Sequence, residues 1–182
     1  MKDIEFEILR NAIVKQAVDD YCAAVRRLVE MNDKDFAIKR IIADGKKGKF
    51  PKVSSMAEAE EERLVRIKIQ EDNLLEVERF FHTEWYKNLC AIGSKYMINI
   101  TKEKAIMDMV NECISGLRAV KAKNLNGKKA QKTLKKFERL KLFLCSDWLK
   151  RFTKRDAEAI LQYMKTESGC IYCDFTVQKC PK

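Results

Sequence analysis

Residues that interrupt helices are scarce in this chain of 182 residues, which contains 6 glycines and 2 prolines. In a helix interior, glycine costs about 1 kcal/mol and proline about 3 kcal/mol relative to alanine. A chain with few of these residues and with many Ala, Leu, Lys, Glu and Met residues favours helices. We therefore predict an all-α fold, with two long N-terminal helices packed side by side and a second helical half behind them.

Apolar periodicity and capping residues predict where these helices begin and end. Ser55 and Glu58 have the S-x-x-E spacing of a capping box, which marks the start of the second long helix. The segments expected before Gly93 are a helix at 3–31, a short helix at 33–43, a basic linker at 44–55 and a helix from 55 to about 89–92. The boundaries expected after Gly93 are an N-cap at Thr101, a break at 124–127, a helix at 128–145, an N-cap within 153–156 and a helix end at Gly169.

The positive charge of the chain is concentrated between residues 118 and 155. This stretch holds fourteen Lys and Arg residues against two acids, a net charge of +12. The whole chain carries +10, so the remaining residues sum to −2. The sequence therefore predicts two parts, an N-terminal helical half at 1–121 and a basic C-terminal half at 122–182 that ends in a cysteine-containing tail. A concentrated positive surface attracts phosphate backbones or an acidic partner.

The segment 128–145 separates into two faces when it is placed on a helix. Its apolar face is expected to pack on the core, and Lys141 falls on that side, where its ammonium group would have to reach past the apolar surface to water. The residues expected on the apolar face are Ala130, Leu134, Phe137, Leu140 and Leu144. The residues predicted to bind nucleic acid or another partner are Lys128, Lys129, Lys132, Lys135, Lys136, Arg139, Lys150 and Arg151. The alternative is a solvated helix face with no binding role.

Two segments of the chain match each other without gaps around the only two tryptophans. Residues 80–89 and 143–152 share the pattern F-[FL]-x-[ST]-[DE]-W-[YL]-K-x-[LF]. We interpret this pattern as a helix end, at which the Thr or Ser caps the next turn and the Phe and Trp side chains pack in the core. We therefore expect Trp85 and Trp148 to be buried, and the alternative is that they bind a partner.

Three segments of the chain carry a resemblance to known proteins, and they are Leu9–Tyr21, Val77–Leu89 and the step into Tyr96–Ile98. They resemble a group of small proteins encoded by phages and mobile elements of Firmicutes. Members of this group usually have Asp-Gly-Glu after the tryptophan segment, where this chain has Ile92-Gly-Ser94. The length and the basic second half also resemble a type II-A anti-CRISPR protein, an inhibitor of Cas9.

The C-terminal tail contains a candidate metal site. Cys170 and Cys173 have the C-x2-C spacing of many zinc sites, and Cys180 would be a third ligand. The candidates for the fourth ligand are Cys145, Cys90 and His82. Such a zinc would be structural, and the alternative is a tail of free thiols.

The number of cysteines and the hydropathy of the sequence predict the cellular compartment of the protein. Seven cysteines, an odd number, favour free thiols or metal ligands in a reducing compartment. The acidic, charged N-terminus does not have the pattern of a signal peptide, and no apolar run reaches the length of a membrane span. We expect a protein of the bacterial host cytoplasm that does not associate with membranes.

The motif content argues against an enzyme. The chain has one histidine and no P-loop, G-x-G-x-x-G, G-x-S-x-G or H-E-x-x-H motif. We therefore expect a non-enzymatic phage anti-CRISPR protein that binds the Cas9 effector with its guide RNA, and double-stranded DNA as a further partner, through the basic helical face. The alternatives are a phage regulatory protein that acts directly on duplex DNA and an assembly protein with an acidic partner.

Overall fold

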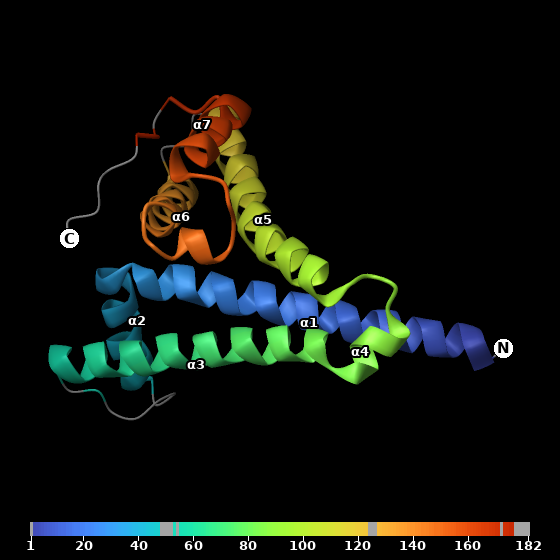
Figure 1. Cartoon of the computed structure of the whole chain (residues 1–182). Coiled ribbons are helices and arrows are strands. Elements are labelled where there is room, and N and C mark those ends of the chain that lie inside the picture. Colours follow the sequence, from blue (N-terminus) through green and yellow to red (C-terminus); the bar gives the residue numbers. More distant parts are fainter. Residues whose placement is uncertain (1, 48–52, 54, 124–126, 172, 177–182) are drawn as a thin grey trace.

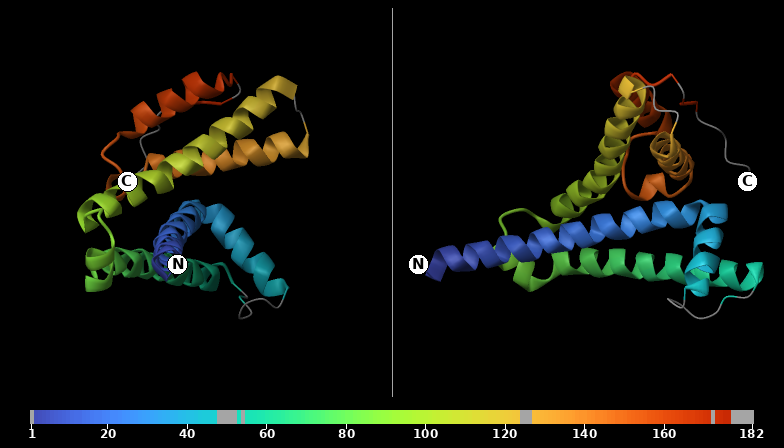
Figure 2. Two further views of the ribbon diagram at one scale, coloured as in Figure 1. Left: turned by 90° about the vertical axis from the view of Figure 1, so that its right-hand side faces the viewer. Right: turned by 180° about the vertical axis from the view of Figure 1, so that it is seen from behind.

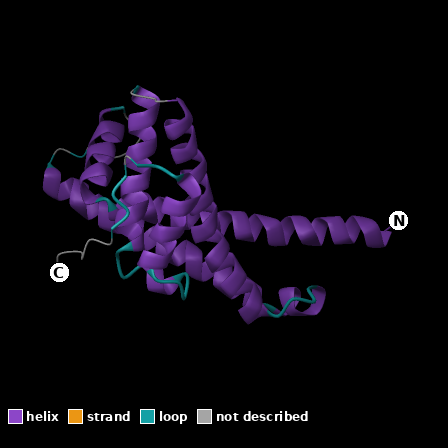
Figure 3. Cartoon of the chain, turned by 90° about the horizontal axis from the view of Figure 1, so that it is seen from above, coloured by secondary structure: helices purple, strands orange, loops and turns teal. Residues whose placement is uncertain are grey.

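The computed structural model describes residues 2–47, 53, 55–123, 127–171 and 173–176. Over these residues the chain forms seven α-helices and one 3-10 helix, and no strand occurs among them (Figures 1 and 3). The prediction of an all-α fold is therefore confirmed. The described part of the chain contains no helix that has both the length and the apolar character needed to cross a membrane.

The lower layer of the molecule is an antiparallel pair of long helices, α1 (Lys2–Asn32) and α3 (Met56–His82) (Figure 1). The short helix α2 (Lys34–Lys46) leaves this pair at one end, and α4 (Glu84–Leu89) reverses the chain at the other. The two predicted long N-terminal helices are thus present and lie side by side.

Side-chain caps set most of the helix starts. The Ser55 Oγ accepts a hydrogen bond from the Glu58 N–H at 3.1 Å, which confirms Ser55 as the N-cap of α3. The Thr83 hydroxyl donates to the Phe80 carbonyl at 2.7 Å and accepts from the Tyr86 N–H at 3.3 Å. The predicted end of this helix at 89–92 is therefore wrong, because Thr83 closes α3 and opens α4.

The upper layer consists of α5 (Ser94–Lys123), α6 (Lys128–Leu144), the 3-10 helix η1 (Leu149–Arg151) and α7 (Ala157–Ser168) (Figure 2). The predicted N-cap at Thr101 is wrong, because α5 begins at Ser94 and continues through this residue. Thr101 is 1% exposed, so its position inside the helix is fixed by burial rather than by capping. The predicted boundaries of α7 are confirmed by the N-cap Asp156 and by Gly169, which ends the helix at φ 55°.

The main core lies between the two layers and joins both predicted halves of the chain. Its buried members come from α1, α3, α5, α6, η1 and α7 and include Tyr21, Leu28, Leu74, Ile106, Leu117, Phe137, Leu149 and Leu161. The predicted boundary between residues 121 and 122 is therefore bridged by side-chain packing. A Cβ added to Gly116 of α5 would lie 2.9 Å from the Thr133 Cγ2 of α6, so these two helices are in close contact.

The N-terminal part of α1 extends past the rest of the molecule (Figure 3). The Arg10 guanidinium group donates a hydrogen bond to the Leu89 carbonyl at 3.1 Å, which ties α1 to the end of α4. The exposed apolar side chains along this part are Ile4, Phe6, Ile8, Leu9 and Ile13.

The two tryptophan segments form equivalent turns, but the tryptophans are not the buried residues. Trp85 is 37% exposed and Trp148 is half-buried, whereas the residues that follow them, Tyr86 and Leu149, are 1% and 4% exposed. The prediction of burial is therefore wrong for Trp85, whereas the half-buried Trp148 packs against the main core. The residue three positions after each capping Thr or Ser is the one that is fully buried, and each indole contacts the preceding Phe.

Candidate polyanion-binding face

Helix α6 has two distinct faces, as its sequence predicts. The apolar side chains of Ala130, Phe137, Leu140 and Leu144 are buried, and Leu134 packs against the same core. Lys128, Lys129, Lys132, Lys135 and Lys136 are exposed and Arg139 is half-buried. Burial of the apolar face holds the helix in place, so its basic face has a fixed orientation.

Four of these cations form one row along α6. Lys128, Lys132, Lys135 and Arg139 are separated by four, three and four residues, which places them within about 60° of each other around a helix. Their spacing along the axis is about 6, 4.5 and 6 Å. Lys129 and Lys136 lie beside this row on the side that faces α5 and α1, as the contact between Lys136 and Glu112 shows.

Several of the predicted binding residues already have partners within the molecule. The Lys136 ammonium is 3.0 Å from the Glu112 carboxylate, and the Arg139 guanidinium lies over the Phe36 ring of α2 at 3.9 Å. Lys150 pairs with Asp147 at 3.1 Å. The Arg151 guanidinium pairs with Glu71 at 2.8 Å and lies over the Trp148 ring at 4.7 Å.

The remaining cations of the face are unpaired among the residues that the structure describes. These are Lys128, Lys129, Lys132 and Lys135, whose ammonium groups make no hydrogen bond or ion pair with a described residue. Like charges this close repel each other, so their clustering costs free energy that an external anion can offset. The eight predicted residues therefore divide into four lysines without a partner in the described part of the chain, three of them in the row, and four residues that contact other side chains of the fold.

Helix α2 adds exposed lysines that the sequence reasoning did not include. Lys39, Lys46 and Lys47 are exposed, and their ammonium groups pair with no acid in the described part of the chain. Lys46 and Lys47 belong to the stretch that was expected to be a linker, but α2 extends to Lys46 and Lys47 is its C-cap. The seven-residue spacing of Lys39 and Lys46, two helical turns, is the signal in the sequence that places them on one face.

A groove of about 440 Å³ lies between α1, α5 and α6. Its rim carries charges of both signs, because Glu112 is 3.5 Å from Arg26 and 3.0 Å from Lys136. The Cys113 side chain lines it, and burial raises the pKa of this thiol to about 12. A thiol that stays protonated at neutral pH is a poor nucleophile.

The first part of the cysteine tail is docked on the upper layer. The Lys141 side chain is buried, and its ammonium group contacts the Asp174 carboxylate at 3.0 Å and donates to the Asp174 carbonyl at 2.7 Å. The prediction that this ammonium group reaches water is therefore wrong, because the tail covers it. The Phe175 ring packs on the Phe137 ring, with the ring centroids 4.9 Å apart.

Two of the three predicted zinc ligands lie together. The Sγ atoms of Cys170 and Cys173 are 3.7 Å apart, close to the roughly 3.8 Å that separates two thiolates on one tetrahedral zinc. Burial raises the pKa of the Cys173 thiol, and its hydrogen bond with Cys170 raises it further. Cys180 lies outside the described residues, and within them no group of three or more His, Cys, Asp or Glu side chains could hold a metal. Cys145, Cys90 and His82 therefore do not complete a site with this pair, and zinc stays a prediction.

No protein family, no curated protein and no solved structure was found that matches this chain.

Proposed function

We propose that this chain is a non-enzymatic inhibitor of a Cas9 effector with its guide RNA, and that it acts by binding nucleic-acid phosphates through α6. The observation that carries the proposal is the set of four unpaired lysines on a helix whose opposite face is buried. The resemblance of the length and of the basic second half to a type II-A anti-CRISPR protein supports the choice of effector.

The electrostatics of α6 favour a polyanion over a single acidic side chain. Lys128, Lys132 and Lys135 of the row lie within seven residue steps, about 10 Å of helix, and duplex DNA carries one negative charge per about 1.7 Å of axis. Several phosphates can therefore contact the row at once and release their bound counterions. An isolated carboxylate would neutralise only one of these lysines.

A binding role rather than catalysis is supported by the side chains near the face. His82 is exposed at the end of α3, and the thiols of the buried Cys113 and the half-buried Cys173 have raised pKa values. Cys113 lines the groove beside Arg139 of the row, but a thiol that stays protonated at neutral pH is a poor nucleophile for a ligand bound there.

The test is a Cas9 cleavage assay with the purified chain and two variants of equal charge. Lys128→Glu/Lys132→Glu/Lys135→Glu reverses the row, and Lys95→Glu/Lys154→Glu/Lys165→Glu reverses three exposed lysines elsewhere. We expect the first variant to need at least tenfold more protein for half-maximal inhibition and the second to inhibit as the wild type does. Equal inhibition by the wild type and the row variant would contradict the proposal.

The second candidate function is regulation by direct binding to duplex DNA, and the exposed lysines of α2 favour it. A regulator would shift a free duplex at low salt and would not co-purify with Cas9 and guide RNA. An inhibitor of the effector would co-purify with it, and the row variant would be lost from that complex.

A further inference from the structure

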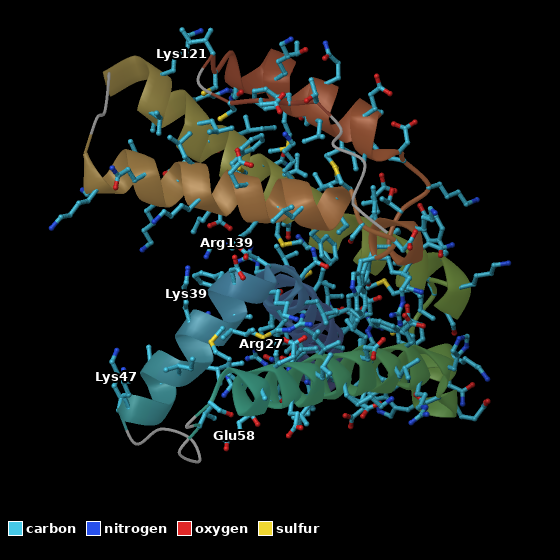
Figure 4. The ribbon with its side chains drawn as sticks, turned by 90° about the vertical axis from the view of Figure 1, so that its left-hand side faces the viewer. Arg27, Lys39, Lys47, Glu58, Lys121 and Arg139 are labelled. Carbon is cyan, nitrogen blue, oxygen red and sulfur yellow. The ribbon has the colours of Figure 1, made fainter. Side chains whose placement is uncertain are left out.

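The lysines of α2 and α6 lie on two helices that diverge from one contact. At that contact the Arg139 guanidinium of α6 is 3.9 Å from the centre of the Phe36 ring of α2. Figure 4 shows Lys39 and Arg139 next to each other there and Lys47 at the far end of α2. The left panel of Figure 2 shows the same divergence from the opposite side, with the N-terminal end of α6 and the C-terminal end of α2 both directed away from the contact.

The two helices hold their lysines in fixed positions. Ala37, Ile38 and Ile41 of α2 are buried, and so are Ala130 and Phe137 of α6. Arg139 connects the helices directly, because its guanidinium stacks on an aromatic ring instead of pairing with an acid. The lysines that have no partner in the described part of the chain therefore lie on two helices that meet at this contact and diverge from it.

We propose that α2 and α6 together grip double-stranded DNA, with α6 on one backbone and α2 on the other. The inference rests on the proposed function, because both require that α6 contacts phosphates. Two cationic helices that diverge from one contact match a ligand with two phosphate strands, whereas a single strand has one backbone and is contacted by α6 alone. For a protein that acts on Cas9, the duplex is the substrate that the effector must open.

The test measures how salt weakens the binding of a labelled 20-base-pair duplex and of one of its single strands to the full chain. The α2 variant is Lys39→Gln/Lys46→Gln/Lys47→Gln, the α6 variant is Lys128→Gln/Lys132→Gln/Lys135→Gln, and the control is Lys95→Gln/Lys154→Gln/Lys165→Gln. Each variant removes three positive charges from exposed positions, so long-range electrostatics change equally. Unchanged melting by circular dichroism checks that each variant is folded.

Each lost phosphate contact lowers the slope of log affinity against log salt by about 0.9 for a duplex. We expect the α2 variant to lower the duplex slope by about 3 and duplex affinity at least tenfold, and to leave single-strand binding within about threefold of the wild type. The α6 variant should weaken both ligands, and the control should weaken neither beyond the effect of net charge.

Two outcomes would overturn the inference. One is an α2 variant that keeps the duplex slope of the wild type, and the other is an α2 variant that loses single-strand binding as strongly as duplex binding. Either result leaves the proposed function intact as long as reversal of the α6 row abolishes inhibition of Cas9. The proposed function itself fails only when that reversal has no effect, so the two failures are distinguishable.

Discussion

In the two matching turns, the residue after each tryptophan is the buried one. Tyr86 is 1% exposed, and its ring centroid is 5.2 Å from that of Phe81. Trp85 is 37% exposed and lies against Phe80, with the ring centroids 5.7 Å apart. We expect Tyr86→Ala to lower the free energy of unfolding by about 3–5 kcal/mol, the usual cost of deleting a buried aromatic side chain. Trp85→Ala should cost about 1 kcal/mol, because much of the indole is already in water. Urea unfolding followed by far-UV circular dichroism measures both values, and equal costs would contradict this assignment of burial.

Asp174 makes the docking of the tail depend on pH. The Thr176 hydroxyl and N–H donate to its carboxylate at 2.7 and 2.9 Å, and together with Lys141 they lower its pKa to about 2. An unfolded aspartate has a pKa of about 3.9, so the folded state favours the charged form. The resulting stabilisation is present above about pH 4 and is lost as the pH falls toward 2.

The measurement for this carboxylate is the difference in urea midpoint between the wild type and Asp174→Asn. We expect the wild type to be the more stable protein at pH 7 and the difference to shrink between pH 4 and 2. A difference that stays constant over this range would show that the carboxylate charge does not stabilise the tail.

At the scale of the elements, Gly116 sets how closely α5 and α6 approach. A Cβ there would lie 2.9 Å from the Thr133 Cγ2, closer than side chains normally pack. We expect Gly116→Ala to destabilise the protein by about 1 kcal/mol, because crowding outweighs the better helix propensity of alanine. In a Thr133→Ser background the methyl group is gone, and the same substitution should stabilise the protein by up to about 1 kcal/mol. Thermal unfolding of the wild type, the two single variants and the double variant measures this double-mutant cycle. If Gly116→Ala had the same effect in both backgrounds, the claim that Thr133 crowds this position would be contradicted.

Helix boundaries are predictable from the sequence where the capping signal is local. Ser55, Asp156 and Gly169 end or begin helices as expected, because their backbone and side-chain chemistry acts locally. Thr101 carries the same local signal but lies inside α5, since its burial depends on residues far away in the sequence. Thr83 interrupts a helix whose apolar pattern continues to residues 89–92, but the repeated tryptophan pattern predicted its cap, which the structure confirms.

The candidate face was predictable in part. The amphipathic pattern of α6 identifies its exposed lysines, because the period of a helix assigns each residue to a face. It does not show which cations are already paired, since Lys136 meets Glu112 and Arg151 meets Glu71 across 24 and 80 residues of sequence. The lysines of α2 become part of the face only because the fold brings α2 beside α6.

At the scale of the whole molecule, the described part of the chain shares one main core. Side chains from α1, α3, α5, α6 and α7 pack together in it, so neither predicted half buries its apolar surface alone. We expect one cooperative unfolding transition, with superimposable curves from far-UV circular dichroism and from tryptophan fluorescence. We also expect residues 1–121 and 122–182 to be unfolded when they are produced separately. Two resolved transitions, or a folded fragment, would contradict this view and support the division at residue 122.

The unpaired lysines of α2 and α6 lie toward one end of a long molecule, away from the projecting start of α1 (Figures 1 and 4). The electric field of a polyanion exerts a torque on a protein with this charge distribution before any contact forms. The chain would then approach nucleic acid with that end first, and a larger fraction of collisions would be productive. Salt would slow association steeply and change the lifetime of the complex much less. How fast the protein reaches its target would thus be set by charges that have no partner in the described part of the chain.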